Sequence, residues 1–316
     1  MIFDNRVTQL LGVDIPIVQA PMGHIAKPPL VAAVADAGAM GLIPGSLGID
    51  EVRDDIHRTR DLTDKAFGMN LPIAFLRDLD IIDMMLDEGI RFITTSAGSP
   101  ERHTARLKDA GLTVFHVVPT LRGAQKAVDA GVDGLVVEGS EGAGFKSPRD
   151  VTSMVLLPLV ASRVGVPIIA AGGMADGRSM AAAFALGAEG VQMGTRMVAT
   201  VESPVHHNMK QAVVDAQETD TMMINQHNGK PVRVLRTAAT EPFELSNTGD
   251  PMSLLGSILD LYHHGDMNAS LPQLGEVAGR IDAIQPVADI IRETIAEFES
   301  VLSVLAGRYL VDAPVG

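Results

Sequence analysis

The stretch VDAGVDGLVV, residues 128–137, holds the pattern that decides the fold. A helical segment ends at Gly131, and a run of apolar and β-branched residues follows after a short connection. Glycine just past a helix takes the left-handed conformation that ends it. A short, continuously apolar run is typical of a parallel strand covered on both faces. The stretch therefore predicts a helix-to-strand junction of an α/β protein.

The same junction recurs along the chain, in ADAGAMGLIP (35–44), LDEGIRFITT (86–95), KDAGLTVFHV (108–117) and ALGAEGVQMG (185–194). Strands are predicted at 15–20, 39–44, 66–71, 91–96, 113–118, 134–139, 167–173 and 190–194, with helical patterns between them. Such regular alternation predicts a (β/α)8 TIM barrel. A doubly wound open sheet is the competing fold, but near-equal units favour closure and no GxGxxG follows the first strand.

The repeat stops after the eighth predicted strand. Helical patterns then occupy 203–216 and most of 251–310. We interpret this part as a C-terminal helical subdomain over the mouth of the barrel. The predicted division assigns 1–215 and parts of 271–316 to the barrel, and 216–300 to a substrate or lid subdomain.

Composition narrows the class of protein. The 316 residues are 46% hydrophobic and 20% charged, with a net charge of −14. This acidity argues against nucleic acid or an anionic membrane as a partner. The chain has no cysteine, which excludes disulfides and thiolate chemistry, and no apolar run long enough to span a membrane. The N-terminus has no signal-peptide pattern. We expect a cytoplasmic enzyme with a small-molecule substrate and leave a homodimer open.

Active sites of TIM barrels lie at the carboxyl ends of the strands. At the ends of the last two predicted strands, Gly172, Gly173, Gly194 and Thr195 offer backbone N–H groups that predict a phosphate site. A helix starting at Asp176 would add a positive dipole end if its N-terminus points inward. The alternative reading of the paired glycines is a tight turn.

Several motifs together resemble a known family. They are PIVQAPMG, LVAAVADAGAMGLI, FGMNL, VDGLVVEGSEGAGF, VPIIAAGGMADGRSMAAAFALGAEGVQMGTR and ESPVH. In this order they resemble the nitronate monooxygenase family, formerly called 2-nitropropane dioxygenases. Relatives of that family include NADH:quinone reductases and flavin-dependent enoyl-acyl-carrier-protein reductases. The likeness spans roughly residues 8–210 and recurs at LGEVAGRI, 274–281.

The resemblance implies an FMN-dependent barrel and assigns residues to the cofactor. Those implied to line the flavin ring are Ala20, Pro21, Met22 and Gly23. Those implied to reach polar atoms of FMN are Asn70 and Glu138. Those implied to let FMN lie close to the backbone are Gly139 and Gly144, and those implied to hold its phosphate are Gly172, Gly173, Gly194 and Thr195.

The chain departs from the family at one position that matters for chemistry. Many members read E-A-G-G-H where this chain reads EGAGF, residues 141–145. The family histidine is the usual acid or base of nitronate oxidation, and Phe145 cannot transfer a proton. Candidate replacements are His24 and Lys146, with a surface charge as the alternative for Lys146. His116 is either near the flavin or a core histidine.

Two further patterns are given structural interpretations. Glu141 is expected to cap the following helix or to pair with Lys146. His206 and His207 resemble a metal site only superficially, because adjacent helical residues face apart, so no metal is expected.

The sequence leaves three hypotheses for function. The first is an FMN-dependent oxidoreductase that oxidises a nitronate-like or reduced substrate through the flavin. The second is an NAD(P)H-dependent quinone or enoyl reductase, favoured by Phe145, with NAD(P)H as co-substrate. The third is a flavin-binding protein without turnover.

Overall fold

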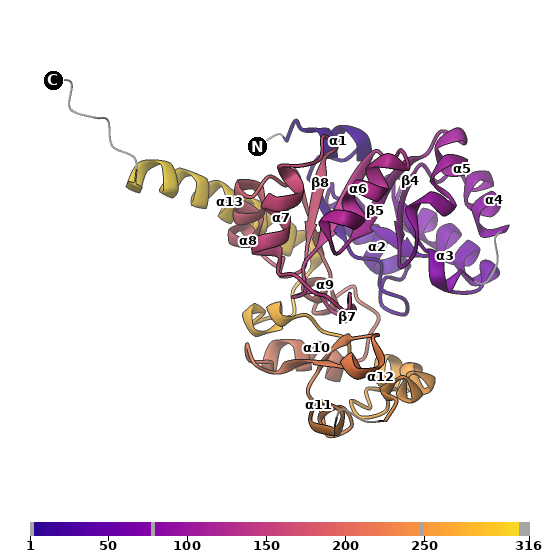
Figure 1. Ribbon diagram of the computed structural model, residues 1–316, viewed down its shortest axis with the longest axis vertical. Helices are drawn as coiled ribbons and strands as arrows, with labels where there is room; N and C mark the ends of the chain where they lie inside the picture. The colour runs from indigo at the N-terminus through magenta and orange to yellow at the C-terminus, as the bar shows by residue number, and fades with distance from the viewer. Residues whose placement is uncertain (1–2, 77–79, 247–248, 310–316) are drawn as a thin grey trace.

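The structure, a computed structural model, describes residues 3–76, 80–246 and 249–309 (Figure 1). Eight parallel strands form one sheet in the order β1-β9-β8-β6-β5-β4-β3-β2. These strands are β1 (Ile17–Gln19), β2 (Leu42–Pro44), β3 (Gly68–Pro72), β4 (Phe92–Ser96), β5 (Thr113–Val118), β6 (Gly134–Glu138), β8 (Ile168–Ala171) and β9 (Gly190–Met193). Each lies within or overlaps one predicted strand.

The two ends of this sheet meet, so it is a closed barrel. The N–H of Met40 donates to the carbonyl of Ile17, and the N–H of Gln19 donates to the carbonyl of Met40, both at 2.9 Å. The side-chain oxygen of Gln19 accepts from the N–H of Leu42 at 3.2 Å. The predicted barrel is confirmed, and the open sheet is excluded.

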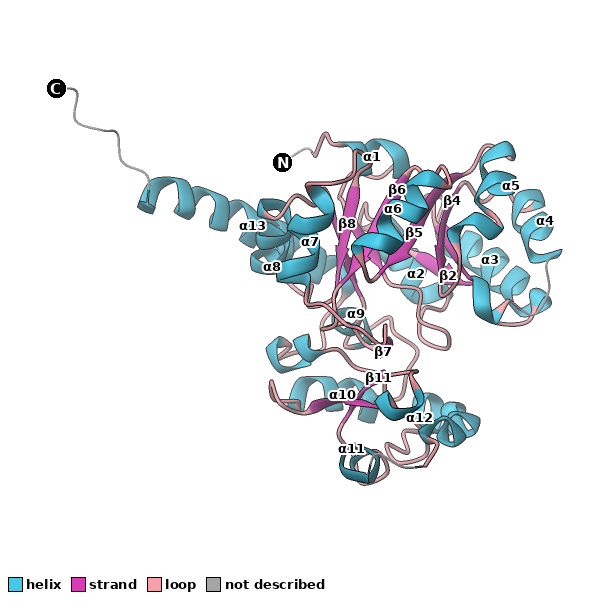
Figure 2. Ribbon diagram, viewed as in Figure 1, coloured by secondary structure: helices cyan, strands magenta, loops and turns pink. Residues whose placement is uncertain are grey.

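Helices between the strands surround the barrel (Figure 2). They are α2 (Pro28–Asp36), α3 (Ile49–Leu62), α4 (Asp80–Asp87), α5 (Thr104–Asp109), α6 (Leu121–Asp129), α7 (Ser153–Ala161) and α8 (Gly177–Ala185), with short 3-10 turns η1 (Ile73–Phe75) and η2 (Pro100–Arg102). Gly131 has a φ of 89°, as expected at a helix-to-strand junction. The other predicted junction glycines also have positive φ.

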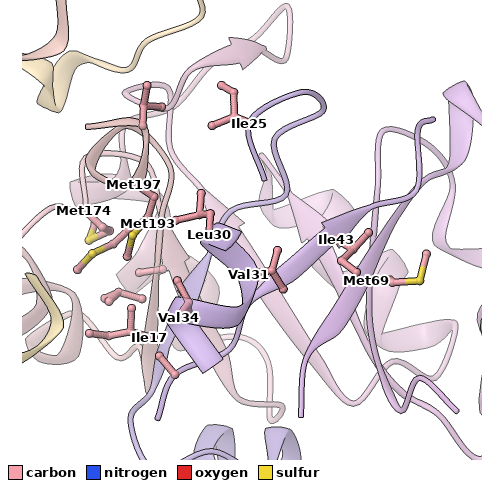
Figure 3. Close-up of a cluster of buried hydrophobic side chains, with 14 of the residues drawn as sticks. Ile17, Ile25, Leu30, Val31, Val34, Ile43, Met69, Met174, Met193 and Met197 are labelled. Atoms are coloured by element: carbon pink, nitrogen blue, oxygen red, sulfur yellow. The ribbon is translucent and has the colours of Figure 1, made fainter. Parts of the chain in front are cut away.

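The core has two layers because both faces of each strand are covered. The inner layer fills the barrel and includes Val18, Phe115 and Val136. The outer layer lies between strands and helices; Figure 3 shows part of it around α2, with Ile17 and Val34. Covering on both faces explains why the strands are continuously apolar rather than alternating.

A short helix that the sequence did not reveal adds to the inner layer. Helix α1 (Arg6–Leu11) buries Val7 and Leu11 in the same cluster as the barrel interior. Asn5 caps it, accepting from the N–H of Thr8 at 2.9 Å. Its two apolar anchors are too few to give a clear helical period, so only the tertiary structure shows them.

Beyond β9 the chain leaves the barrel and later returns to it (Figure 1). The elements on the way are α9 (Thr195–Val198), α10 (His207–Asp215), β10 (Thr221–Ile224), η3 (Gln226–Asn228), β11 (Val232–Leu235), α11 (Glu241–Ser246), η4 (Pro251–Ser257), α12 (Ile258–His264) and η5 (Glu276–Arg280). A bridge between Thr200 and Gln285 marks the return, and α13 (Val287–Tyr309) then packs on α8 and α2. We call residues 201–284 the inserted region.

The inserted region is not purely helical, which corrects the predicted composition of the subdomain. Strands β10 and β11 form an antiparallel sheet with β7 (Gly144–Phe145) from the loop after β6. The strands are short, and β11 pairs with a segment far upstream, so no local pattern reveals them. The predicted division into a barrel of 1–215 with parts of 271–316 and a subdomain of 216–300 stays a prediction. Residues 247–248 and 310–316, which it includes, lie outside the described ones.

Candidate active site

The carboxyl ends of β1, β9, β8 and β6 are neighbours in the barrel and bring most of the predicted cofactor residues together. A Cβ added at Gly194 would lie 3.5 Å from Cβ of Ala20 and 4.0 Å from Sδ of Met22. A Cβ at Gly23 would meet no atom closer than Oγ of Ser46, at 4.0 Å. The protein's own packing therefore does not demand glycine at 23 or 194, and both positions leave backbone accessible to a ligand.

Other glycines at this rim are required by the fold itself. Gly172 has a φ of 87°, and a Cβ there would lie 3.0 Å from the carbonyl oxygen of Gly139. A Cβ at Gly139 would lie 2.4 Å from the backbone nitrogen of Ser153. The tight-turn interpretation thus accounts for Gly172, and close backbone packing accounts for Gly139. The contact of these glycines and of Gly173 with a cofactor stays a prediction.

The inserted region supplies a residue to the rim that the barrel repeat does not contain. The hydroxyl of Thr195 accepts from the N–H of Gly275 at 2.9 Å and keeps its own proton available for donation. A Cβ at Gly275 would lie 2.7 Å from the carbonyl oxygen of Glu141. Sequence reasoning did not assign Gly275 to the site, although it lies in LGEVAGRI, where the family likeness recurs.

Glu141 caps the helix that follows it, which is the first of the two roles expected from the sequence. Its carboxylate accepts from the N–H of Ser153 at 2.9 Å and from the Ser153 hydroxyl at 2.7 Å, at the start of α7. Its carbonyl accepts from the N–H of Glu276 at 2.9 Å. Glu141 therefore holds both α7 and the returning chain.

The start of α8 is not available to a phosphate, contrary to the conditional expectation. Asp176 accepts from the N–H of Ser179 at 2.8 Å and forms an ion pair with Arg280. A Cβ at Gly177 would lie 2.4 Å from the carbonyl oxygen of Thr294 in α13. The positive end of this helix is already satisfied by a carboxylate and covered by another helix.

Polar side chains face the interior of the barrel at this end. The amide of Asn70 donates to the hydroxyl of Thr94 at 2.9 Å and to that of Ser96 at 3.2 Å. Gln192 is paired in register with Val18, which belongs to the inner layer, so it also points inward. The Oε1 atom of Gln192 is buried and has no hydrogen-bond partner among the described residues.

Lys146 is not a surface charge, because its side chain is only 5% exposed. Its ammonium pairs with the carboxylate of Glu138, and its N–H donates to the carbonyl of Pro231 at 2.9 Å. Gly142 lies against both members of this ion pair. Lys146 therefore pairs with Glu138 rather than with Glu141, so its ammonium group at the mouth is held in an ion pair.

His24 lies where the first loop meets the inserted region. Its ring centroid is 6.4 Å from that of His263 in α12. Burial above all, and then the charges of Lys27 and His263, lower the pKa of His24 below its usual value. His24 and Lys146 occupy different surroundings, and their catalytic role stays a prediction.

His116 is a core histidine, and the hypothesis that it lies near a flavin is wrong. Its neighbour Phe115 belongs to the inner layer, whereas Val114 and Val118 belong to the outer one. His116 therefore points away from the barrel interior. The hydroxyl of Thr95 lies 2.7 Å from its Nδ1, and burial lowers the pKa of His116 to about 4.

With this geometry in place, comparison with known proteins decides the family. The model of the nitronate monooxygenase family matches residues 4–81 and 74–297. The chain belongs to this family. It is therefore an oxidoreductase of a flavin-dependent family, and the resemblance seen in the sequence is confirmed.

The chain is similar to three known proteins, two of which are solved structures. The structure of FabK from Thermotoga maritima matches with a TM-score of 0.92 and 39% identity, covering 96% of this chain and 99% of that one. Nitroalkane oxidase from Streptomyces ansochromogenes matches with a TM-score of 0.82 and 26% identity, covering 94% and 99%. The (3aS,4S,5R,7aS)-5-hydroxy-7a-methyl-1-oxo-octahydro-1H-indene-4-carboxyl-CoA dehydrogenase of Mycobacterium tuberculosis is 37% identical over 242 residues, which are 75% of this chain and 68% of that protein.

Phe145, at the position where the family resemblance implies a histidine, is 44% exposed. Phe75, which follows β3, is 48% exposed, and the two ring centroids are 5.5 Å apart. Strands β4 and β5 separate β3 from β6 in the sheet. The contact between the two rings therefore joins the loops that follow β3 and β6 across part of the barrel mouth. The sequence singled out Phe145, but its aromatic partner was visible only in the structure.

The residues at the carboxyl ends of the strands fit the flavin that this family uses. Gly23 and Gly194 leave open backbone, the Thr195 hydroxyl can donate, and the buried Oε1 of Gln192 lacks a donor.

Among the described residues no group of three His, Asp or Glu could hold a metal ion, and His206 instead accepts from the N–H of Asn208 at the start of α10. Within the same residues, no helix is both long and apolar enough to cross a membrane.

Proposed function

We propose that the protein is an FMN-dependent reductase that accepts electrons from NAD(P)H and delivers them to an apolar, conjugated acyl thioester. The observation that carries this proposal is the exposed Phe145–Phe75 pair at the mouth. The family resemblance implies a proton-transferring histidine at the position of Phe145. An aromatic wall binds and desolvates an apolar acyl chain, but it provides no base for a nitronate.

The comparisons support a thioester substrate without identifying it. The Mycobacterium tuberculosis relative is named for a carboxyl-CoA substrate that carries an apolar fused-ring system. The family resemblance also includes flavin-dependent enoyl-acyl-carrier-protein reductases. A quinone is the competing apolar acceptor, and the reoxidation experiment below distinguishes it from a thioester.

The residues of this chain would divide the work as follows. FMN, when bound, supplies the two-electron redox chemistry. Thr195 and the backbone of Gly194 would hold its phosphate, and Gln192 would accept from its ring. Lys146 would act through Glu138 as a positioning residue, since the two form an ion pair.

Nitronate oxidation is the second candidate function. The family match and the likeness to nitroalkane oxidase favour it. His24, at the edge between the first loop and α12, is then the candidate base, because its lowered pKa keeps the imidazole neutral and able to accept a proton.

Anaerobic stopped-flow reduction separates the two functions. Native protein and Phe145→His are mixed in parallel with NADH, NADPH and propionate 3-nitronate, and flavin absorbance is followed. We expect a nicotinamide to reduce the native flavin fastest. Phe145→His should raise the nitronate rate by about 10²-fold, the lower end of what a general base contributes. The matched control, Phe75→His, changes the other ring of the pair and should not raise it.

The acceptor is identified by reoxidation of the reduced protein. A medium-chain 2-enoyl-CoA, its saturated analogue and a quinone are added under the same conditions. Rapid reoxidation by the enoyl thioester alone supports the proposal. Fast reduction of native protein by the nitronate, with no reaction toward either nicotinamide, would establish the second candidate instead.

A further inference from the structure

A cavity of about 290 Å³ lies between the start of α8, helix α9, the chain that follows η5 and the first half of α13. The glycines predicted to hold the phosphate of FMN do not line it, and neither does Thr195. A cavity of this size is at the lower limit for a ligand pocket, so it suits a small molecule. Its charged lining residues are Asp176, Arg196, Arg280, Asp282, Glu293 and Glu297.

Arg196 brings a buried guanidinium to this cavity and is only 4% exposed. Its Nη2 donates to the carbonyl of Ala283 at 2.9 Å, and to the carbonyl of Ala199 and the side-chain oxygen of Gln285 at 3.3 Å each. All three acceptors are neutral. The Nε atom of Arg196 is buried and has no hydrogen-bond partner among the described residues.

The positive charge of Arg196 is not matched by a carboxylate in contact with it. A buried charge is costly unless it is paired, so a buried guanidinium normally forms an ion pair. Arg196 forms none with a described residue. Burial lowers its pKa, and the charges of Asp282 and Glu293 oppose this effect without touching the guanidinium. The cavity therefore contains an anion-binding group that the protein leaves unpaired.

Two of the carboxylates around the cavity are already neutralised by arginines. Asp176 at the start of α8 forms an ion pair with Arg280. An oxygen of Glu297 in α13 lies 2.8 Å from Nε of Arg178. These groups are occupied by the protein itself, so they do not attract a charged ligand.

Two carboxylates remain for a ligand. Asp282 is exposed, and its side chain has no hydrogen bond or ion pair with a described residue. Glu293 accepts from the side-chain amide of Gln285 at 3.0 Å, and its other oxygen lies 3.7 Å from the guanidinium of Arg292. A simple anion that reached Arg196 would meet these carboxylates, and a simple cation would meet Arg196. The unpaired groups of the cavity therefore fit a molecule that carries both charges.

We propose that this cavity binds a small zwitterion with one carboxylate and one ammonium group, the chemistry of a free amino acid. The carboxylate pairs with the guanidinium of Arg196, whose planar fork matches two oxygens. The ammonium group lies at Asp282 and Glu293. Arg196 directly follows Thr195 in α9 and also holds Ala283 of the returning chain, so the ligand stabilises the junction between these two segments.

Isothermal titration calorimetry of the full-length protein as purified tests this site. The probes are glycine, L-alanine, β-alanine and 4-aminobutanoate, which differ in the separation of the two charges. Propionate, propylamine and inorganic phosphate are the controls that carry charge of one sign. We expect at least one zwitterion to bind about tenfold or more tightly than each of these controls, because both of its charges make contacts.

Variants of the two ends of the cavity separate the two contacts. Asp282→Asn, at an exposed position that folding tolerates, should weaken the zwitterion about tenfold and leave propionate binding at least as tightly as before. Arg196→Met should weaken the zwitterion and propionate alike. Asp289→Asn, which changes a carboxylate of α13 that does not line the cavity, is the matched control and should bind as native protein does.

Two results would overturn the proposal. The first is equal affinity for propionate or phosphate and for the zwitterions, unchanged in Asp282→Asn, which would indicate a plain anion site. The second is native protein that shows neither a heat of binding nor a raised unfolding midpoint with any of the four zwitterions in the millimolar range, since a ligand of the folded state must stabilise it.

Discussion

Single side chains at the residue scale decide which chemistry the mouth of this barrel permits. Phe145 packs on Phe75 at the position where the family resemblance implies an imidazole, and the neighbouring Lys146 forms an ion pair with Glu138. Phe145 cannot transfer a proton, and a substrate would reach the Lys146 ammonium only by competing with its ion pair to Glu138. The change of one residue alters the expected reaction without altering the fold.

His116 makes the stability of the protein depend on pH. Burial holds its pKa at about 4, compared with 6.5 for the ordinary side chain. Between these pH values the unfolded chain binds a proton that the folded chain does not. This stabilisation is therefore complete above pH 6.5 and is lost as the pH falls towards 4, by up to roughly 3 kcal/mol.

His116→Gln retains a polar partner for Thr95 but removes this titration. We expect the free energy of unfolding in urea to fall less for the variant than for native protein between pH 7 and pH 4.5, by about 2 kcal/mol. His207→Gln, at an exposed position of α10, is the control and should follow the native profile. Parallel pH profiles of native protein and His116→Gln would contradict the assigned burial effect.

At the scale of elements, the glycines of the strand-end turns separate into two kinds. Gly172 has a left-handed backbone conformation and lies against another backbone segment, so it serves the fold. Gly194 has ordinary contacts and negative φ, so its lack of a side chain serves no packing of its own. The sequence pattern is the same glycine-rich turn in both cases, and only contacts distinguish them.

This difference predicts opposite outcomes for two alanine variants. Gly172→Ala should lower the free energy of unfolding by about 1–3 kcal/mol, because alanine is strained there. Gly194→Ala should leave the stability of cofactor-free protein within about 0.5 kcal/mol and weaken FMN binding at least about tenfold, measured by fluorescence quenching. Gly48→Ala has open space and controls for loss of glycine alone. Unchanged FMN affinity in Gly194→Ala would remove Gly194 from the cofactor site.

At the scale of the whole molecule, the inserted region is fastened to the barrel close to the site. Buried Arg233 in β11 donates from Nε to the carbonyl of Ser140 at 2.9 Å, and its Nη2 lies 2.8 Å from the carboxylate of Glu276. These contacts join the β6 loop, the antiparallel sheet and the returning chain at η5. The Thr195 hydroxyl depends on the same returning chain through Gly275.

Arg233→Met removes these bonds while keeping an apolar stem. We expect it to lower the free energy of unfolding by about 1.5–3 kcal/mol, as for hydrogen bonds involving a charged group. Partial proteolysis should then cut the inserted region sooner. Arg236→Met is the matched control, because Arg236 is more exposed than Arg233 and loses an ion pair with Glu244, which should cost less than about 1 kcal/mol. Equal losses in the two variants would show that Arg233 does not fasten the region.

The sequence alone was sufficient for the barrel and for the family. Each helix-to-strand junction is a local pattern, in which a helix end, a glycine and an apolar run are contiguous in the chain. Regular repetition of this local pattern leaves few arrangements for the strands, and closure follows. The glycine-rich ends of β6, β8 and β9 and the phenyl ring at position 145 could be read directly, because they are properties of single positions.

Only the tertiary structure decided which way several side chains point and what they meet. His116 lies in a strand that is apolar on both faces, so no alternation in the sequence indicates its direction. Other contacts join segments that are far apart in the chain. They bury Lys146, pair β7 with β11 and form the hydrogen bond from Gly275 to Thr195. Such contacts arise because a parallel barrel gathers its strand ends at one rim, where an insertion from one strand end can cover another.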